Sequence, residues 1–296
     1  VNLRFEKPTN DTEASIELEY GDYDSRKLKL AMNLPFSDSL RLRFSGMSLR
    51  RDGFSINMFP GKEGKDIDGR KISSYRAILE ADLGENTLAR FTFLNFEEDD
   101  NRARAGRQMC KMTETPAYGC RPDQFGREQP TAGSGLNGLL LAAAGLQSFS
   151  PLDTAPSRPL LGIRETYQAI DPVYKVDEKA YIFAIENSSF ENLNIKANFA
   201  LHERRILTQQ DYTNNDGRTK LYKGTNPFFP DGILPISGFT DPNRVGSLGI
   251  FGGSVAGYHD FPFAYDSSLN DNEYKYGDII VSSDFNGNIN FTAGFN

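Results

Sequence analysis

The chain has 296 residues, enough for one large domain or two ordinary ones, and its formal net charge of −7 argues against a nucleic-acid partner. No apolar run approaches the length of about 18 residues that a transmembrane helix needs. Two Cys and two His are too few for a typical Cys/His zinc site. The first residues, VNLRFEKPTN, contain no Met and no apolar leader segment, so we expect the chain to begin inside a longer precursor.

Alternation of apolar and polar residues along the chain predicts β-strands with two unlike faces. Residues 193–201, LNIKANFAL, show the pattern well, because every odd position is apolar and the positions between are polar or small. No long amphipathic helix is visible. In chain order the predicted strands cover 14–21, 26–34, 39–50, 73–84, 87–96, 178–187, 192–203, 275–285 and 288–296. The sequence therefore predicts an all-β chain.

Short and long connections between these strands alternate. The short ones are 35–39, 84–86, 188–191 and an Asn-Gly turn at 286–287, and the long ones are 51–72, 97–177 and 204–274. In an up-and-down meander every second connection lies on the same side, so the long loops would share one rim. That arrangement is typical of an outer-membrane β-barrel with short periplasmic turns and long extracellular loops. We therefore expect an antiparallel up-and-down transmembrane β-barrel fragment of about nine strands.

In the central part of each predicted strand one set of alternate positions is apolar and free of charge, whereas the other set carries most of the Glu, Asp, Lys and Arg. A Lys or Arg that faces lipid at mid-bilayer costs about 2–4 kcal/mol, but a wet lumen tolerates it. The residues that we expect to face lipid include Leu193, Ile195, Phe199, Leu201 and Phe291. A soluble β-sandwich would show the same alternation. The loop alternation and the aromatic residues near the strand ends favour the barrel.

Residues 1–54 resemble the junction between plug and barrel in TonB-dependent receptors of the bacterial outer membrane. The segments that carry the resemblance are a Lys-Pro dipeptide after a final plug strand (7–8), YGDYDSR (20–26), NLPFSDSLRLR (33–43) and RRDGF (50–54). The resemblance implies that residues 1–9 end the plug domain and that residues 10–296 form the N-terminal portion of the barrel.

The family forms a 22-stranded barrel occluded by an N-terminal plug. The resemblance implies uptake of a scarce solute, bound by extracellular loops and lumen residues and driven by the inner-membrane TonB–ExbB–ExbD complex. A ferric siderophore, another chelate or an oligosaccharide would suit such a receptor. The chain departs from the family pattern because it has about nine strands, nearly no plug and no visible TonB box, the short segment that the complex pulls.

The long connections hold the candidate sites. In an exported protein Cys110 and Cys120 are expected to form a disulfide, with a metal pair or free thiols as the alternatives. Aromatic residues near Arg and His recognise sugars or aromatic chelates by stacking and hydrogen bonding, and self-packing of the loops is the alternative. The candidate ligand-binding residues are Tyr118, Arg121, Phe125, Phe228, Phe229, Tyr258, His259 and Phe261.

The acidic run 97–100, EEDD, permits calcium binding, but pairing with nearby arginines is the expected role. We find no catalytic constellation, resident metal site or cofactor motif, and we expect no enzymatic activity. Two functions compete with active uptake. One is a passive outer-membrane porin or channel, and the other is a surface β-rich carbohydrate-binding or adhesion protein.

Overall fold

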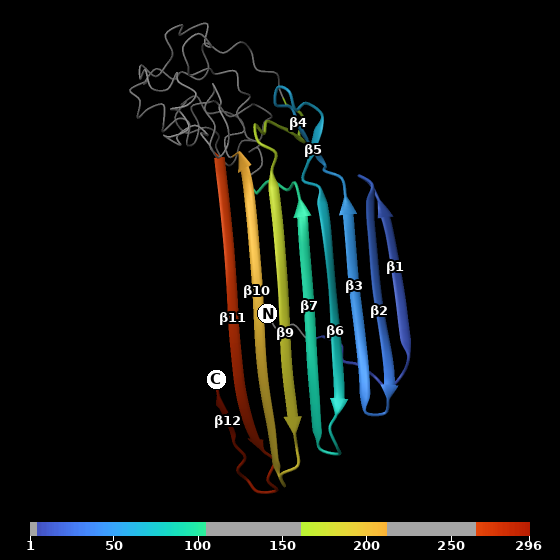
Figure 1. Cartoon of the computed structure of the whole chain (residues 1–296), viewed down its shortest axis with the longest axis vertical. Helices are drawn as coiled ribbons and strands as arrows, with labels where there is room; N and C mark the ends of the chain where they lie inside the picture. Colours follow the sequence, from blue (N-terminus) through green and yellow to red (C-terminus); the bar gives the residue numbers. More distant parts are fainter. Residues whose placement is uncertain (1–4, 105–160, 212–264) are drawn as a thin grey trace, which may run out of the picture.

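The computed structural model describes residues 5–104, 161–211 and 265–296 (Figure 1). Over these ranges the secondary structure is entirely strand, turn and irregular chain. Within these residues no helix has the length and apolar character needed to cross a membrane. The prediction of an all-β chain is confirmed for the part that the structure describes.

Nine strands form one antiparallel sheet whose spatial order follows the chain, β1-β2-β3-β6-β7-β9-β10-β11-β12. The strands are β1 (Glu13–Gly21), β2 (Ser25–Ser37), β3 (Leu40–Arg51), β6 (Arg70–Asp82), β7 (Thr87–Asp100), β9 (Val173–Asn187), β10 (Leu193–Asp211), β11 (Tyr265–Ser283) and β12 (Thr292–Phe295). The meander is up-and-down, as predicted. The sheet is open, with β1 and β12 as its edges.

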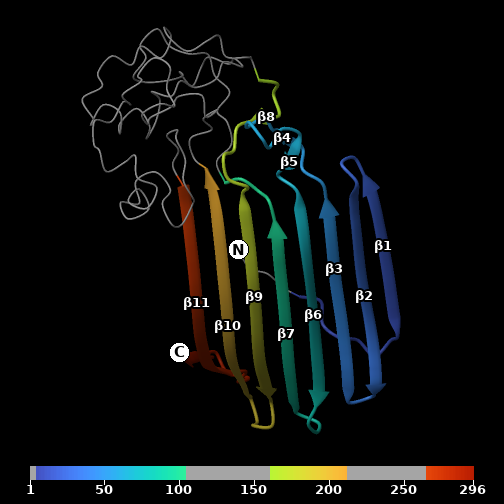
Figure 2. The ribbon, with the colours of Figure 1, turned by 45° about the horizontal axis from the view of Figure 1, so that its top comes forward.

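A small second sheet, the rim sheet, lies at the upper end of the large one (Figure 2). Its strands are β4 (Ser55–Asn57), β5 (Lys65–Ile67) and β8 (Glu165–Thr166). Beside it Phe59, Leu161, Tyr167 and Ala169 form an apolar cluster. The aromatic ring of Phe59 is thus buried in this cluster.

The connections alternate between the two rims of the sheet (Figure 1). The connections 38–39, 83–86, 188–192 and 284–291 join strand ends at the lower rim, and the connections 22–24, 52–69, 101–172 and 212–264 join strand ends at the upper rim. The predicted alternation of short and long connections from β2 onward is therefore confirmed.

The predicted tight turn at 286–287 is wrong, because eight residues separate β11 from β12. The Asn290 side chain holds this wider loop: its Oδ1 accepts from the Phe285 amide at 2.6 Å and its Nδ2 donates to the Phe285 carbonyl at 3.2 Å. The predicted final strand 288–296 consequently shortens to β12.

The upper ends of β7, β9, β10 and β11 extend beyond the predicted strands. β10 and β11 each have 19 residues and pair along their full length, from Leu193↔Ser283 to Asp211↔Tyr265, so each is about 65 Å long. The predicted connections 97–177 and 204–274 are therefore too long. Their strand-forming ends carry polar residues on both faces, so no apolar alternation marks them in the sequence.

Candidate functional site: a two-faced sheet and an N-terminal strap

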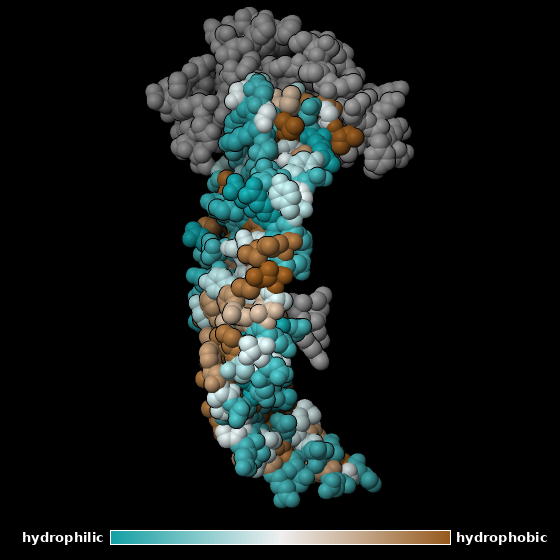
Figure 3. Space-filling view, turned by 90° about the vertical axis from the view of Figure 1, so that its right-hand side faces the viewer, coloured by the Kyte–Doolittle hydropathy of each residue, from teal (hydrophilic) through white to brown (hydrophobic). Residues whose placement is uncertain are grey.

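One face of the large sheet carries rows of apolar side chains that cross it from strand to strand. Residues directly opposite each other in paired strands lie on the same face, so the register defines each row. The central row consists of Leu34, Leu42, Leu79, Phe91, Phe183 and Phe199. Figure 3 shows apolar surface gathered at mid-height of the sheet, with hydrophilic surface above it. We call this face the apolar face and the other the polar face.

The apolar band crosses the sheet obliquely. A higher row begins with Ile16, Leu30, Gly46 and Tyr75 on the first strands and ends with Asn95, Lys179, Glu203 and Glu273 on the later ones. A single row thus changes from apolar to charged between β6 and β9. Strands that tilt by 35–45° in a bilayer require such a slope, because a membrane plane then cuts the hydrogen-bonded rows at an angle.

The residues predicted to face lipid fall on or beside this face. Leu193, Ile195, Phe199 and Leu201 alternate along β10 on the apolar face, and the Phe199 side chain is 53% exposed. Phe291 lies just before β12, where its ring is 6.1 Å from that of Phe285. Their contact with lipid stays a prediction.

The aromatic residues at the upper boundary of the band form a ladder across strands. The ring centroid of Phe93 lies 5.8 Å from that of Tyr75 and 5.1 Å from that of Tyr181. At the lower rim Phe36 and Phe190 are exposed in or beside short turns. Aromatic girdles of this kind flank the apolar band of membrane barrels.

The polar face carries a chain of alternating charges across five strands. Its members are Asp82, Arg41, Glu80, Arg90, Glu186 and Lys196. Arg41 lies 2.8 Å from Asp82 and 3.3 Å from Glu80, and Arg90 lies 2.6 Å from Glu80. Arg41 and Glu80 are almost fully buried by their neighbours. Each of these charges has an opposite partner, and because charged side chains are costly in lipid, this part of the polar face suits contact with protein or water.

Nearer the upper rim, Glu178 lies 3.1 Å from His202 and 3.2 Å from Arg204. The His202 ring stacks on Tyr274 with centroids 5.9 Å apart. This arrangement offers an aromatic surface and charged groups on the polar face, which suits binding of a solute with rings or hydroxyl groups.

Residues 5–12 form a strap that crosses the polar face. The Asn33 side chain, fully buried, donates to the carbonyls of Thr9 and Asp11 and accepts from the Thr9 amide. Arg43 pairs with Glu6. Further along the strap the Phe5 ring lies 4.1 Å from the Arg76 guanidinium, and Asn10 accepts from Arg41. Every one of these partners on the sheet lies on the polar face.

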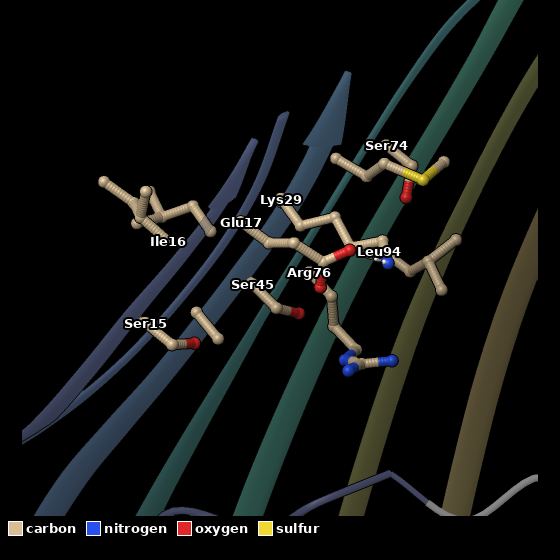
Figure 4. Close-up of a pocket in the computed structure, with 12 residues that line it drawn as sticks. Ser15, Ile16, Glu17, Lys29, Ser45, Ser74, Arg76 and Leu94 are labelled. Carbon is tan, nitrogen blue, oxygen red and sulfur yellow. Dashed lines mark hydrogen bonds and ion pairs between the residues drawn. The ribbon is translucent and has the colours of Figure 1, made fainter. Parts of the chain in front are cut away.

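Next to the strap, the polar face has a groove of about 580 Å³. Figure 4 shows Glu17, Lys29 and Arg76 on one side of the strands and Ile16 on the other. Glu17 and Lys29 pair at 2.7 Å, whereas the Arg76 guanidinium contacts the Phe5 ring of the strap. The groove therefore presents one guanidinium beside the hydroxyl groups of Ser45 and Ser74.

The acidic run 97–100 has the structural role that we expected. Glu98 lies 2.9 Å from Arg102, Asp99 lies 3.2 Å from Lys175 and Asp100 lies 3.7 Å from Arg70. The described residues contain no group of three or more metal-ligating side chains.

Outside the strands, the Asp171 carboxyl joins the rim sheet through Lys62 at 3.1 Å and Lys65 at 2.6 Å. Partial burial of this carboxyl opposes its ionisation, but the hydrogen bonds from Lys65 and Lys62 prevail and hold its pKa below the usual value.

The remaining predicted site residues lie outside the described ranges. They are Cys110, Cys120, Tyr118, Arg121, Phe125, Phe228, Phe229, Tyr258, His259 and Phe261. The disulfide and the ligand-binding roles stay predictions. The sequence analysis did not single out Asn33 or the charge chain, although these residues occupy the alternate strand positions that the sequence assigns to the polar face.

Among the solved structures that resemble this chain, one matches nearly its whole length. It is the open form of the ferric-catecholate import receptor Fiu from E. coli K12, with a TM-score of 0.53, 12% sequence identity, and coverage of 95% of this chain. The match covers 32% of the receptor, so this chain spans about a third of that protein's length. No protein-family model matches the chain, and no curated protein matches it either. At this identity the likeness concerns the fold alone, which is distantly related to that of this ferric-catecholate import receptor.

Proposed function

We propose that this chain is part of a TonB-dependent receptor that imports a scarce solute across the bacterial outer membrane. The observation that carries the proposal is the strap, residues 5–12, which is bound across the polar face of a sheet whose other face is apolar. In this assignment residues 5–9 of the strap are the end of a plug domain, and the barrel portion begins at residue 10, still within the strap. Lipid covers the apolar face.

The electrostatics support this orientation. The buried pair Arg41–Glu80 and the strap partner Arg43 all lie on the polar face. Turning that face to lipid would cost about 2–4 kcal/mol for each Lys or Arg at mid-depth. The central apolar row, from Leu34 to Phe199, would carry no such cost. The open edges at β1 and β12 must pair with further strands in a bilayer, because unpaired backbone groups are not tolerated there.

The solute class follows from the resemblance and from the aromatic composition of the long connections. We propose a ferric siderophore, another chelate or an oligosaccharide, bound by Tyr118, Arg121, Phe228, Tyr258 and neighbouring loop residues. The TonB–ExbB–ExbD complex would supply the energy. Transport without catalysis is part of the same proposal.

In a passive porin a strap across the polar face would obstruct the lumen, so the strap favours the receptor. In a soluble surface protein the apolar face would pack against protein and not against lipid. A nitroxide label at Ile195 and, separately, at Asn194 distinguishes the soluble alternative. In the full-length protein in bilayers we expect oxygen to reach the label at 195 and a water-soluble quencher to reach the label at 194. A label at 195 that neither reagent reaches, in a protein that stays monomeric without detergent, would refute the membrane assignment.

Conductance distinguishes the porin. The full-length protein in a planar bilayer should conduct little, because the plug that precedes the strap blocks the lumen. Steady open-channel current from the unmodified protein would favour passive diffusion and contradict active uptake.

A further inference from the structure

Three cations stand side by side on the apolar face of β2, β3 and β6, directly above the apolar band. The register pairs Arg26 with Arg50 and Arg50 with Lys71. Directly opposed residues have Cβ atoms about 4.5–5.5 Å apart, and like charges at that spacing repel. All three residues are exposed. An anion that binds between these three cations would remove their mutual repulsion.

The protein supplies only part of that negative charge. Arg26 lies 2.8 Å from Asp24, which offsets one of the three cations. Among the described residues no acidic side chain forms an ion pair with Arg50 or Lys71. The next residue along the row, Asp99, is held by Lys175 at 3.2 Å and so is not available to them. Two positive charges therefore remain uncompensated at neighbouring positions.

The location of the row indicates the kind of anion. Below Arg26 on the same face of β2 come Leu28, Leu30, Met32 and Leu34, so the cations begin where the apolar residues end. The row also lies near the upper ends of β2, β3 and β6, next to the connections 22–24 and 52–69. If the apolar face contacts lipid, the row lies at the depth of the lipid headgroups of the outer leaflet. Guanidinium and ammonium groups match phosphate oxygens in charge and in hydrogen-bonding capacity.

We infer that Arg50 and Lys71, flanked by Arg26, bind the phosphate of a phosphorylated lipid headgroup in the outer leaflet. This inference rests on the proposed membrane orientation, but it adds a lipid partner and a site that uptake by itself does not require. The phosphate would bridge β3 and β6 and remove the repulsion between their cations.

The test uses the full-length protein in neutral detergent, titrated with phosphatidic acid and followed by native mass spectrometry. Each cation at an anionic lipid surface contributes about fivefold in affinity, so Arg50→Gln/Lys71→Gln should weaken binding about 25-fold. The matched control is Lys27→Gln/Lys29→Gln, which removes two cations from the polar face of β2. We expect the control to change the affinity less than twofold and phosphatidylcholine to bind equally to all variants.

Equal affinity of both double variants for phosphatidic acid would overturn the assignment. Displacement of the lipid by millimolar inorganic phosphate would also overturn it, because the site would then take free phosphate. The nitroxide at Ile195 separates this failure from failure of the proposed function. If that label contacts lipid while the variants bind alike, only the headgroup site is wrong.

Discussion

Placing a charge at the centre of the apolar face should destabilise the protein strongly, and the same charge one residue away should not. Ala197 is the middle of five outward positions on β10, which run from Leu193 to Leu201. Eight steps of about 3.4 Å make this stretch about 27 Å long, or about 19 Å deep at a tilt of 45°. Ala197 then lies about 10 Å from either interface. At that depth Arg costs about 2–4 kcal/mol.

Asn198 provides the control, because it is the next residue on β10 and lies on the polar face. Its Nδ2 donates to the Asp278 carboxylate at 3.1 Å, so an arginine there would gain an acidic partner. We expect Ala197→Arg to lower the free energy of unfolding by about 3 kcal/mol and Asn198→Arg to change it by less than about 0.5 kcal/mol.

The measurement is equilibrium unfolding of the full-length protein from lipid vesicles in guanidinium chloride. If both variants unfold at the same denaturant concentration as the parent, the apolar face does not contact lipid. If Asn198→Arg is the more damaging variant, the two faces have been assigned the wrong way round. Either result would refute the reasoning from the faces of the sheet.

Three further predictions concern the polar face and the rim. Glu80→Gln should destabilise the barrel by about 2 kcal/mol, because two arginines lose a charged hydrogen-bond partner, whereas Glu17→Gln at an exposed pair should leave the unfolding midpoint unchanged. Asn33→Ala should cost about 1–3 kcal/mol locally and speed amide exchange in residues 6–11, with unchanged exchange there contradicting the role of Asn33. The pKa of the Asp171 carboxyl is lower in the folded protein than the value of about 4 that it has in the unfolded chain. The ionised carboxyl therefore stabilises the rim sheet fully above a pH of about 4, and this stabilisation is lost as the pH falls through the lower pKa of the folded state. Exchange of the Ile56 and Met58 amides, corrected for intrinsic rates, should therefore rise only in acid, and Asp171→Asn should abolish that step.

The sequence predicted the strands well where one face is apolar. Segments such as 193–201 place Leu, Ile and Phe at every second position, and these residues lie on one face of β10 in the structure. Prediction failed where this contrast disappears. Residues 204–211 and 265–274 are mostly polar on both faces, with Ile206, Leu207 and Leu269 as scattered exceptions, so only the pairing of β10 with β11 reveals that they are strands.

The sequence showed which charged residues lie on the polar face, but it did not show which of them form ion pairs. Arg41 and Glu80 are 39 positions apart, and only the register of β3 against β6 brings them together. Asn33 gave even less signal, since its partners belong to a segment that crosses the sheet without joining it. In contrast, the NG dipeptide at 286–287 gave a false signal, because the Asn290 side chain closes a wider loop at that place.

The order of contacts along the strap determines how it would respond to mechanical force. Phe5 on Arg76, Glu6 on Arg43 and Thr9 on Asn33 follow one another toward β1. A pull on the N-terminal end would load the first of these contacts alone and reach the Asn33 cluster last. Such a peeling geometry breaks contacts one at a time, so the peak force is set by the strongest single contact and not by their sum. The nine-stranded sheet would stay unstrained until the strap had come away, since β1 begins only at Glu13.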